Sequence, residues 1–336
     1  MTSVASRLGQ VTAIAFTAVN SVEIVGMPLQ EPEEGEYRVR AEVSAVSPGT
    51  ELRCLAGMQQ TPLQFPFIPG YALVGIVESA GDGTNLPLGT RVLCDGTRRS
   101  SIPSMWGGHV SHALCREASV TVVPDGVWPE SAAIAKLAAI AQRGVDVSHP
   151  QPGERVVVIG LGLIGLLSAR LFASEGCRVL AMDRLPQRVS AARSPLISAR
   201  LIKSTAAELV RDEFPEGIDI LVDATGNEQA LLSSIECCPI LPFGDTRREG
   251  TRLVIQGSYP GSFTIPYQDA FMRELTILVP RDTRPVDKRA VLKAIAEGRL
   301  DVHDLANNRF CPSEAATAYR QLQSGEISTA LFDWRS

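Results

Sequence analysis

The first third of the chain shows the period-two alternation of apolar and polar residues that a half-buried β-strand requires. The clearest case is YRVRAEVSA at residues 37–45, and short β-branched runs follow in YALVGIVES, TRVLC and SVTVV. Glycine and proline separate these runs, which is typical of strands joined by turns rather than by crossover helices. Residues 1–125 are therefore predicted to form a β-rich domain, either a barrel or a sandwich.

The pattern changes near residue 126. The segment PESAAIAKLAAIAQRGV has a helical composition, and from QPGERVVVIG onwards buried strands alternate with amphipathic helical stretches. This alternation predicts an α/β fold with a doubly wound parallel sheet over residues 126–284. Residues 285–336 contain two predicted helices and a last strand, TALFDW, which do not continue the alternation. We expect this tail to return to the first domain.

Length and composition agree with two globular domains. The chain has 336 residues, of which 45% are hydrophobic and 21% charged, and this length exceeds what one compact core usually holds. The net charge of −5 comes without a block of basic residues, which argues against nucleic acid and membrane surfaces as partners. The seven cysteines form no CxxC pair, and the N-terminal MTSVASRLGQ has no apolar core of signal-peptide length. We therefore expect a cytoplasmic protein with reduced thiols.

A glycine-rich fingerprint, GLGLIG, follows a β-branched strand and opens a predicted helix. Gly160 allows a tight turn, Gly162 lets the backbone approach a pyrophosphate, and Gly165 lets the helix pack on the strand. The first helical amides, at Leu163 and Ile164, are expected to face the phosphates. The fingerprint predicts a dinucleotide-binding site.

Asp183 bears on the choice of dinucleotide. It ends the next predicted strand, where a carboxylate accepts hydrogen bonds from an adenosine ribose and repels a 2′-phosphate, so NAD is predicted. Arg184 and Arg188 follow closely and could instead pair with that phosphate. NADP therefore stays an alternative.

These parts together resemble the medium-chain dehydrogenase/reductase superfamily from about Val11 to Trp334. The motifs that carry the resemblance are SPGTE, PGYALVGIVESAG, GGHVSHALC, VVVIGLGLIG, DILVDATGNEQAL and RELTI. SPGTE, the tyrosine after PG, AFMRE and the terminal DW are similar to the zinc-free branch that includes the hydroxyethyl bacteriochlorophyllide dehydrogenases. The resemblance implies a GroES-like catalytic domain beside a Rossmann domain, Thr225 and Gly226 near the nicotinamide, a small-molecule substrate and a homodimer.

The zinc ligands of the superfamily's alcohol dehydrogenases are replaced in this chain. By the resemblance, their four positions hold Pro48, Tyr71, Ala72 and Lys136. Proline and alanine have no donor atom, an ammonium repels a cation, and a catalytic zinc needs three protein ligands. The region of the structural zinc lobe, CDGTRRSSIPSMWGG, has one cysteine. A metal-free enzyme is predicted.

Tyr71 and Lys136 are predicted to replace the metal, because both positions direct ligands at one point in zinc-binding relatives. An ammonium beside a phenol favours the phenolate, which could exchange a proton with an alcohol or a ketone. Thr50 takes the place of a family hydroxyl that bonds the substrate oxygen. The alternative is that Tyr71 packs in the barrel, Lys136 pairs with Glu51, and Thr50 bonds its own turn.

The other polar and aromatic candidates receive lesser roles. His109 and His112, in GGHVSHA, are interpreted as structural, with His109 a weak catalytic candidate. Met105 and Trp106 are expected to form a wall of the substrate pocket.

The leading functional prediction is a zinc-independent, NAD(P)-dependent oxidoreductase that interconverts a secondary alcohol and a ketone. One alternative is a zinc-free alkene or quinone reductase, in which hydride attacks a conjugated carbon. The other is a non-catalytic dinucleotide-binding protein, because a fold and a cofactor site do not establish turnover.

Overall fold

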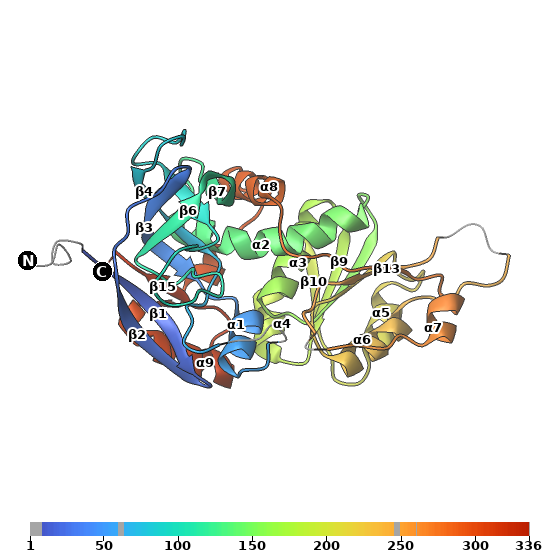
Figure 1. The fold of residues 1–336 in the computed structure, drawn as a ribbon. Helices are drawn as coiled ribbons and strands as arrows, with labels where there is room; N and C mark the ends of the chain where they lie inside the picture. The colour runs from blue at the N-terminus through green and yellow to red at the C-terminus, as the bar shows by residue number, and fades with distance from the viewer. Residues whose placement is uncertain (1–8, 60–63, 245–248, 260, 336) are drawn as a thin grey trace, which may run out of the picture. The chain divides into compact units, whose positions relative to one another are not determined.

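The computed structural model describes residues 9–59, 64–244, 249–259 and 261–335. The chain forms two compact units, the first made of residues 1–136 and 288–336 and the second of residues 137–287. The unit boundaries at residues 136/137 and 287/288 fall within helices α2 (Pro129–Ser148) and α8 (Pro285–Ala296), which are labelled in Figure 1. None of the helices in the described part of the chain combines the length and apolar character of a membrane span.

The first unit is rich in β-structure, as predicted. One sheet has the strand order β14-β15-β3-β4-β5-β7, with β6 also paired to β3, and a separate hairpin joins β1 to β2. Besides α2 and α8, its strands and helices are β1 (Gln10–Ala18), β2 (Ser21–Pro28), β3 (Glu36–Ala45), α1 (Pro48–Leu55), β4 (Leu73–Ala80), β5 (Arg91–Cys94), β6 (His112–Arg116), β7 (Val120–Val122), β14 (Arg309–Phe310), α9 (Ala315–Ser324) and β15 (Leu331–Asp333).

Strand β3 organises this unit because it pairs antiparallel with β4, β6 and β15. Its apolar residues Tyr37, Val39 and Ala41 are buried, while Arg40 between them is exposed, which is the predicted alternation. They share one core with Val11 and other residues of the hairpin. The pairing of β15 with β3 returns the C-terminal tail to this unit.

The second unit is the predicted doubly wound sheet. Its strand order is β10-β9-β8-β11-β12-β13, and every neighbouring pair is parallel. The order reverses direction between β8 and β11, where parallel α/β sheets bind ligands at the carboxyl ends of their strands. Its elements are β8 (Arg155–Ile159), α3 (Leu163–Ser174), β9 (Arg178–Asp183), α4 (Pro186–Ala192), β10 (Ile197–Leu201), α5 (Ala206–Glu213), β11 (Ile220–Asp223), α6 (Glu228–Ser234), β12 (Arg252–Ile255), α7 (Tyr267–Met272) and β13 (Thr276–Leu278).

Both faces of this sheet are covered, which explains why its central strands are continuous apolar runs rather than alternating ones. Alternate strand residues such as Val157 and Leu221 pack with Val210 of α5 and Leu231 of α6 in one core. Helix α2 also packs against the sheet, since a Cβ at Gly144 would lie 3.2 Å from the Val254 side chain. The predicted Rossmann fold is confirmed.

Candidate active site

The glycine fingerprint lies at the reversal of strand order in the second unit. Gly160 follows β8 with a φ of +90°, a left-handed conformation that glycine adopts without strain. A Cβ there would lie 2.9 Å from Thr225 Cγ2, and a Cβ at Gly165 would lie 1.8 Å from the Gly160 carbonyl oxygen. The turn after β8 is therefore packed tightly against both α3 and the segment after β11.

The start of α3 is open where the rest of the fingerprint is crowded. Gly162 is the N-cap residue and no side chain caps the helix. A Cβ at Gly162 would meet no atom within 4 Å. The amides of Leu163 and Ile164 belong to the first turn, whose N–H groups have no partner within a helix. This is the arrangement that a pyrophosphate requires.

Asp183 ends β9 and is 7% exposed. Its Oδ2 accepts from the Leu161 amide at 2.7 Å and its Oδ1 from the Leu185 amide at 2.9 Å. The Arg188 guanidinium lies 3.5 Å from Oδ2, whereas Arg184 is exposed to solvent. The carboxylate is thus fixed beside the fingerprint and forms an ion pair with Arg188.

A buried polar group ends β11 at the same edge of the sheet. The Asp223 carboxylate is fully buried and accepts from Thr225 Oγ1 at 2.6 Å and from the Tyr259 hydroxyl. Burial raises the pKa of Asp223, although the hydrogen bonds oppose the shift, and burial followed by the Asp223 carboxylate raises the pKa of Tyr259. Gly226 is held close to the next loop, because a Cβ there would lie 2.7 Å from the Ser258 carbonyl oxygen.

In the first unit, Tyr71 lies between the left-handed Gly70 and the start of β4 and is half-buried. Its hydroxyl donates to Ser47 Oγ at 2.5 Å. Its ring meets Trp106 edge to face, with centroids 5.2 Å apart, and the Lys136 ammonium lies over the ring, 5.7 Å from its centroid. The structure therefore brings Tyr71 and Lys136 together, and it adds the Ser47 hydroxyl and the Trp106 ring.

Lys136 belongs to α2 and is 3% exposed. Its ammonium lies 3.3 Å from Asp95 Oδ1, and the Lys288 ammonium lies 3.2 Å from both Asp95 oxygens. A buried ammonium needs such a partner to stay charged. The sequence left open a pairing of Lys136 with Glu51, but the structure pairs Lys136 with Asp95, and Glu51 bonds Ser47, His109 and Tyr319 instead.

Glu51 of α1 is fully buried and accepts three hydrogen bonds. Its Oε1 receives the Ser47 amide at 2.7 Å, and its Oε2 receives His109 Nε2 at 2.9 Å and the Tyr319 hydroxyl. Burial, followed by the Glu51 charge, raises the pKa of Tyr319. Thr50 lies beside Glu51 in the first turn of α1 and is half-buried.

Ser47, Asp95 and Tyr319 are residues of this site that sequence reasoning missed. Ser47 stands inside the SPGTE motif, which offered a signal. Tyr319 is 268 residues from Glu51, so no local pattern joins the two.

The residues at the four replaced positions do not fit a zinc ion. Pro48 begins α1 and Ala72 is buried, but neither side chain has a donor atom, and Lys136 presents an ammonium. Throughout the residues that the structure describes, no group of three or more His, Cys, Asp and Glu side chains is placed to hold a metal ion.

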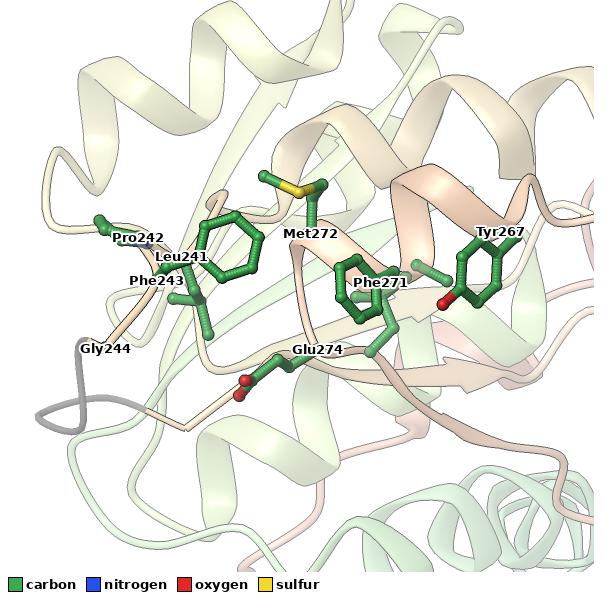
Figure 2. A pocket seen from close by; sticks show the side chains of 10 residues that line it. Leu241, Pro242, Phe243, Gly244, Tyr267, Phe271, Met272 and Glu274 are labelled. Atoms are coloured by element: carbon green, nitrogen blue, oxygen red, sulfur yellow. The ribbon is translucent and has the colours of Figure 1, made fainter.

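A separate cavity of about 390 Å³ lies around α7 and the segment before it, and it shares no residue with the fingerprint. Figure 2 shows Phe243, Phe271 and Tyr267 along it. Tyr267 and Phe271 stack with centroids 5.5 Å apart, and Phe243 lies 6.4 Å from Phe271. Glu274 is the charged residue in its lining.

Comparison with known proteins gives consistent results. Residues 33–134 match the family model described as the alcohol dehydrogenase GroES-like domain. The 2-desacetyl-2-hydroxyethyl bacteriochlorophyllide A dehydrogenase of Cereibacter sphaeroides is 26% identical over 97% of this chain and 98% of its own length. D-arabinitol dehydrogenase 1 of Uromyces fabae is 24% identical over 80% of this chain and 82% of its own length.

The fold is also similar to that of solved dehydrogenases. The acetophenone reductase of Geotrichum candidum, solved in complex with NAD, superposes with a TM-score of 0.79 at 17% identity, over 96% of this chain and 97% of that one. The predicted combination of a Rossmann sheet and a GroES-like domain is thereby confirmed.

Proposed function

We propose that this chain, which its fold and sequence similarities support as a member of the medium-chain dehydrogenase/reductase superfamily, is an NAD-dependent dehydrogenase that interconverts a secondary alcohol and a ketone without zinc. The observation that carries the proposal is the cluster of Tyr71, Lys136 and Ser47. A phenol, a buried ammonium and a hydroxyl meet there, and the family resemblance implies that Tyr71 and Lys136 take the places of zinc ligands. The relatives reported above act on hydroxyl and carbonyl groups, according to their names.

In the proposed reaction NAD supplies the hydride acceptor, and the protein's own residues manage the proton. Alcohol oxidation releases one proton from the hydroxyl oxygen, and the phenolic oxygen of Tyr71 takes it. The charge of Lys136 over the ring favours the ionised phenol, and Ser47 Oγ holds the phenolic oxygen in place. Thr50 is proposed to hydrogen-bond the substrate oxygen. In ketone reduction the same groups return the proton.

The dinucleotide is proposed to bind at the fingerprint of the second unit. Gly160, Gly162 and Gly165 shape the turn, and the amides of Leu163 and Ile164 hold the pyrophosphate. Asp183 is proposed to hold the adenosine ribose and thereby to favour NAD. Thr225 and Gly226 are proposed to contact the nicotinamide half.

Zinc independence is proposed from the donor set. Purified protein should contain no stoichiometric zinc, and a chelator should leave its activity unchanged. Elemental analysis after dialysis tests this. About one zinc per chain, together with activity that a chelator removes, would contradict the proposal.

A hydride-transfer screen tests the function. Purified protein is mixed with NAD and a panel of secondary alcohols, and separately with NADH or NADPH and a panel of ketones and enones. Alcohol oxidation with NAD supports the dehydrogenase. Turnover of enones alone would indicate the alkene or quinone reductase, and tight NAD binding without turnover of any substrate would indicate a non-catalytic protein.

The remaining assignments follow from the family resemblance and the composition. A small organic molecule is proposed as the substrate, a homodimer as the assembly and the cytoplasm as the location. Sedimentation of the purified protein at several concentrations tests the homodimer.

A further inference from the structure

We propose that His109 is a positioning residue that holds the Tyr71 hydroxyl in place through Glu51 and Ser47. The inference rests on the catalytic role proposed for Tyr71. It assigns to His109 a task beyond filling the core, and it begins from an unusual serine.

Ser47 is the N-cap residue of α1, but its side chain does not cap the helix. A serine in this place normally accepts a hydrogen bond from an amide of the first turn. Here Ser47 Oγ instead accepts from the Tyr71 hydroxyl at 2.5 Å. The position of the Tyr71 hydroxyl therefore depends on where the backbone holds Ser47.

Glu51 fixes that backbone. The Glu51 amide donates to the Ser47 carbonyl oxygen at 2.9 Å, and the Ser47 amide donates to Glu51 Oε1 at 2.7 Å. The two residues are thus joined twice across the first turn of α1. A buried carboxylate is stable only if its oxygens are well hydrogen-bonded, so Glu51 keeps this position only while Oε2 has donors as well.

His109 supplies one of those donors. Its Nε2 lies 2.9 Å from Glu51 Oε2, and both side chains are fully buried. Its Nδ1 lies 2.8 Å from Ser44 Oγ, which also receives the Trp334 indole N–H at 2.9 Å. Because an indole nitrogen can only donate, Ser44 Oγ accepts from it and can give its own proton to Nδ1. In that tautomer the proton of the imidazole is on Nε2, which donates a hydrogen bond to Glu51 Oε2.

The same ring also contacts the chain just before Tyr71. A Cβ at Gly70 would lie 2.6 Å from Cδ2 of His109, so the imidazole rests directly on the Gly70 backbone. His109 therefore touches both supports of the phenol. It packs directly on Gly70, and it acts through Glu51 on Ser47, which accepts the hydrogen bond of the Tyr71 hydroxyl. Phenylalanine would keep the packing and lose the hydrogen bonds.

The test follows the Tyr71 ring directly and needs no substrate. 3-Fluorotyrosine is incorporated at position 71 and its ¹⁹F resonance is recorded in the full-length protein. His109→Phe should shift and broaden the resonance. Ser47→Ala, which removes the acceptor and leaves the helix cap unaffected, should shift it in the same way. His109→Gln, whose amide can donate to Glu51, should restore most of the original signal.

His112→Phe is the matched control. His112 also faces a carboxylate, with Nε2 3.3 Å from Glu78, but neither residue is bonded to Ser47 or Tyr71. The resonance should stay unchanged in this variant. A resonance that is equally unchanged in His109→Phe, or equally changed in His112→Phe, would overturn the inference. If His109→Phe does not fold, His109→Leu, which also lacks a donor for Glu51, takes its place, and an unchanged resonance in that variant would overturn the inference.

Activity provides the second measurement. With the best substrate of the screen, kcat of His109→Phe should fall roughly tenfold at unchanged KM for NAD. In a Tyr71→Phe background the same substitution should have no further effect, whereas a merely structural role would give additive losses. An inactive wild-type protein would refute the proposed function, while the ¹⁹F result would still decide the positioning role.

Discussion

The two candidate sites, the dinucleotide half in the second unit and the Tyr71 half in the first, are built by different means. The dinucleotide half depends on backbone geometry within a short segment, where Gly160 and Gly165 leave room for close packing. The Tyr71 half depends on side chains from distant segments, such as Glu51 and Tyr319. A backbone site allows few substitutions, because almost any side chain obstructs it. A side-chain site can change its chemistry when one residue replaces another, as is proposed for the phenol of Tyr71 and the ammonium of Lys136.

The largest expected effect contrasts two glycines of the fingerprint. Gly165→Ala should lose both stability and NAD binding, because its Cβ would lie 1.8 Å from the Gly160 carbonyl oxygen. Gly162→Ala should fold normally, since its Cβ would meet no atom within 4 Å, but it should bind NAD at least about tenfold more weakly, because the methyl group occupies the approach to the pyrophosphate. Thermal unfolding and calorimetric titration with NAD measure the two effects. Wild-type NAD affinity in Gly162→Ala would contradict the phosphate-binding role.

This contrast also explains how much the sequence could predict. The parallel sheet and the fingerprint were predictable, because strand runs and glycine spacing are local patterns. The meeting of Tyr71 and Lys136 was predicted only from the family resemblance. Two partners at this site were not predictable, because contacts between distant segments leave no local pattern. They are Asp95, which pairs with Lys136, and Tyr319, which bonds Glu51. Because Ser47 stands directly before the first residue of α1, Pro48, the sequence alone would predict that its hydroxyl caps the helix. The structure shows that this hydroxyl bonds Tyr71 instead.

The next effect tests the side-chain half. Tyr71→Phe and Lys136→Met should each lower kcat by roughly 10²-fold, while NAD affinity stays nearly unchanged. Lys288→Met is the matched control, because Lys288 shares the Asp95 carboxylate with Lys136. It should retain most of the activity. Steady-state kinetics with the best substrate of the screen provide the measurement, and near-wild-type turnover in Tyr71→Phe would return the phenol to a packing role.

A smaller effect is expected at the ribose. Asp183→Ser should weaken NAD binding about tenfold to a hundredfold and should relax the exclusion of NADP, since a hydrogen-bonded carboxylate contributes roughly 1–3 kcal/mol. Arg188→Ala is the companion variant, because Arg188 lies 3.5 Å from Asp183 Oδ2. Titrations of both variants with NAD and NADP separate the two residues. Tighter binding of NADP than of NAD by the wild-type protein would show that an arginine governs the site.

The smallest effect concerns Asp223, whose buried carboxylate bonds Thr225 and Tyr259 in the dinucleotide half. Because burial raises its pKa, the folded protein binds this proton more tightly than the unfolded chain does. Its contribution to stability is therefore fully present below the ordinary carboxyl pKa of ~4 and is lost as the pH rises through the raised value. In Asp223→Asn this titration is removed, so the free energy of unfolding relative to wild type should increase as the pH rises above about 4.

Denaturant unfolding at a series of pH values measures that difference, and Asp212→Asn, at an exposed carboxylate of the same unit, serves as the control. Parallel pH profiles for wild type and Asp223→Asn would contradict the raised pKa. If the free energy of unfolding of Asp223→Asn rises relative to wild type with pH, the ionised Asp223 carboxylate destabilises the folded protein. Asp223 bonds the hydroxyl of Thr225, which is proposed to contact the nicotinamide. The lost stability would then come from a residue that supports a proposed cofactor contact. Both the dinucleotide half and the Tyr71 half would depend on buried polar side chains, the dinucleotide half to a smaller degree.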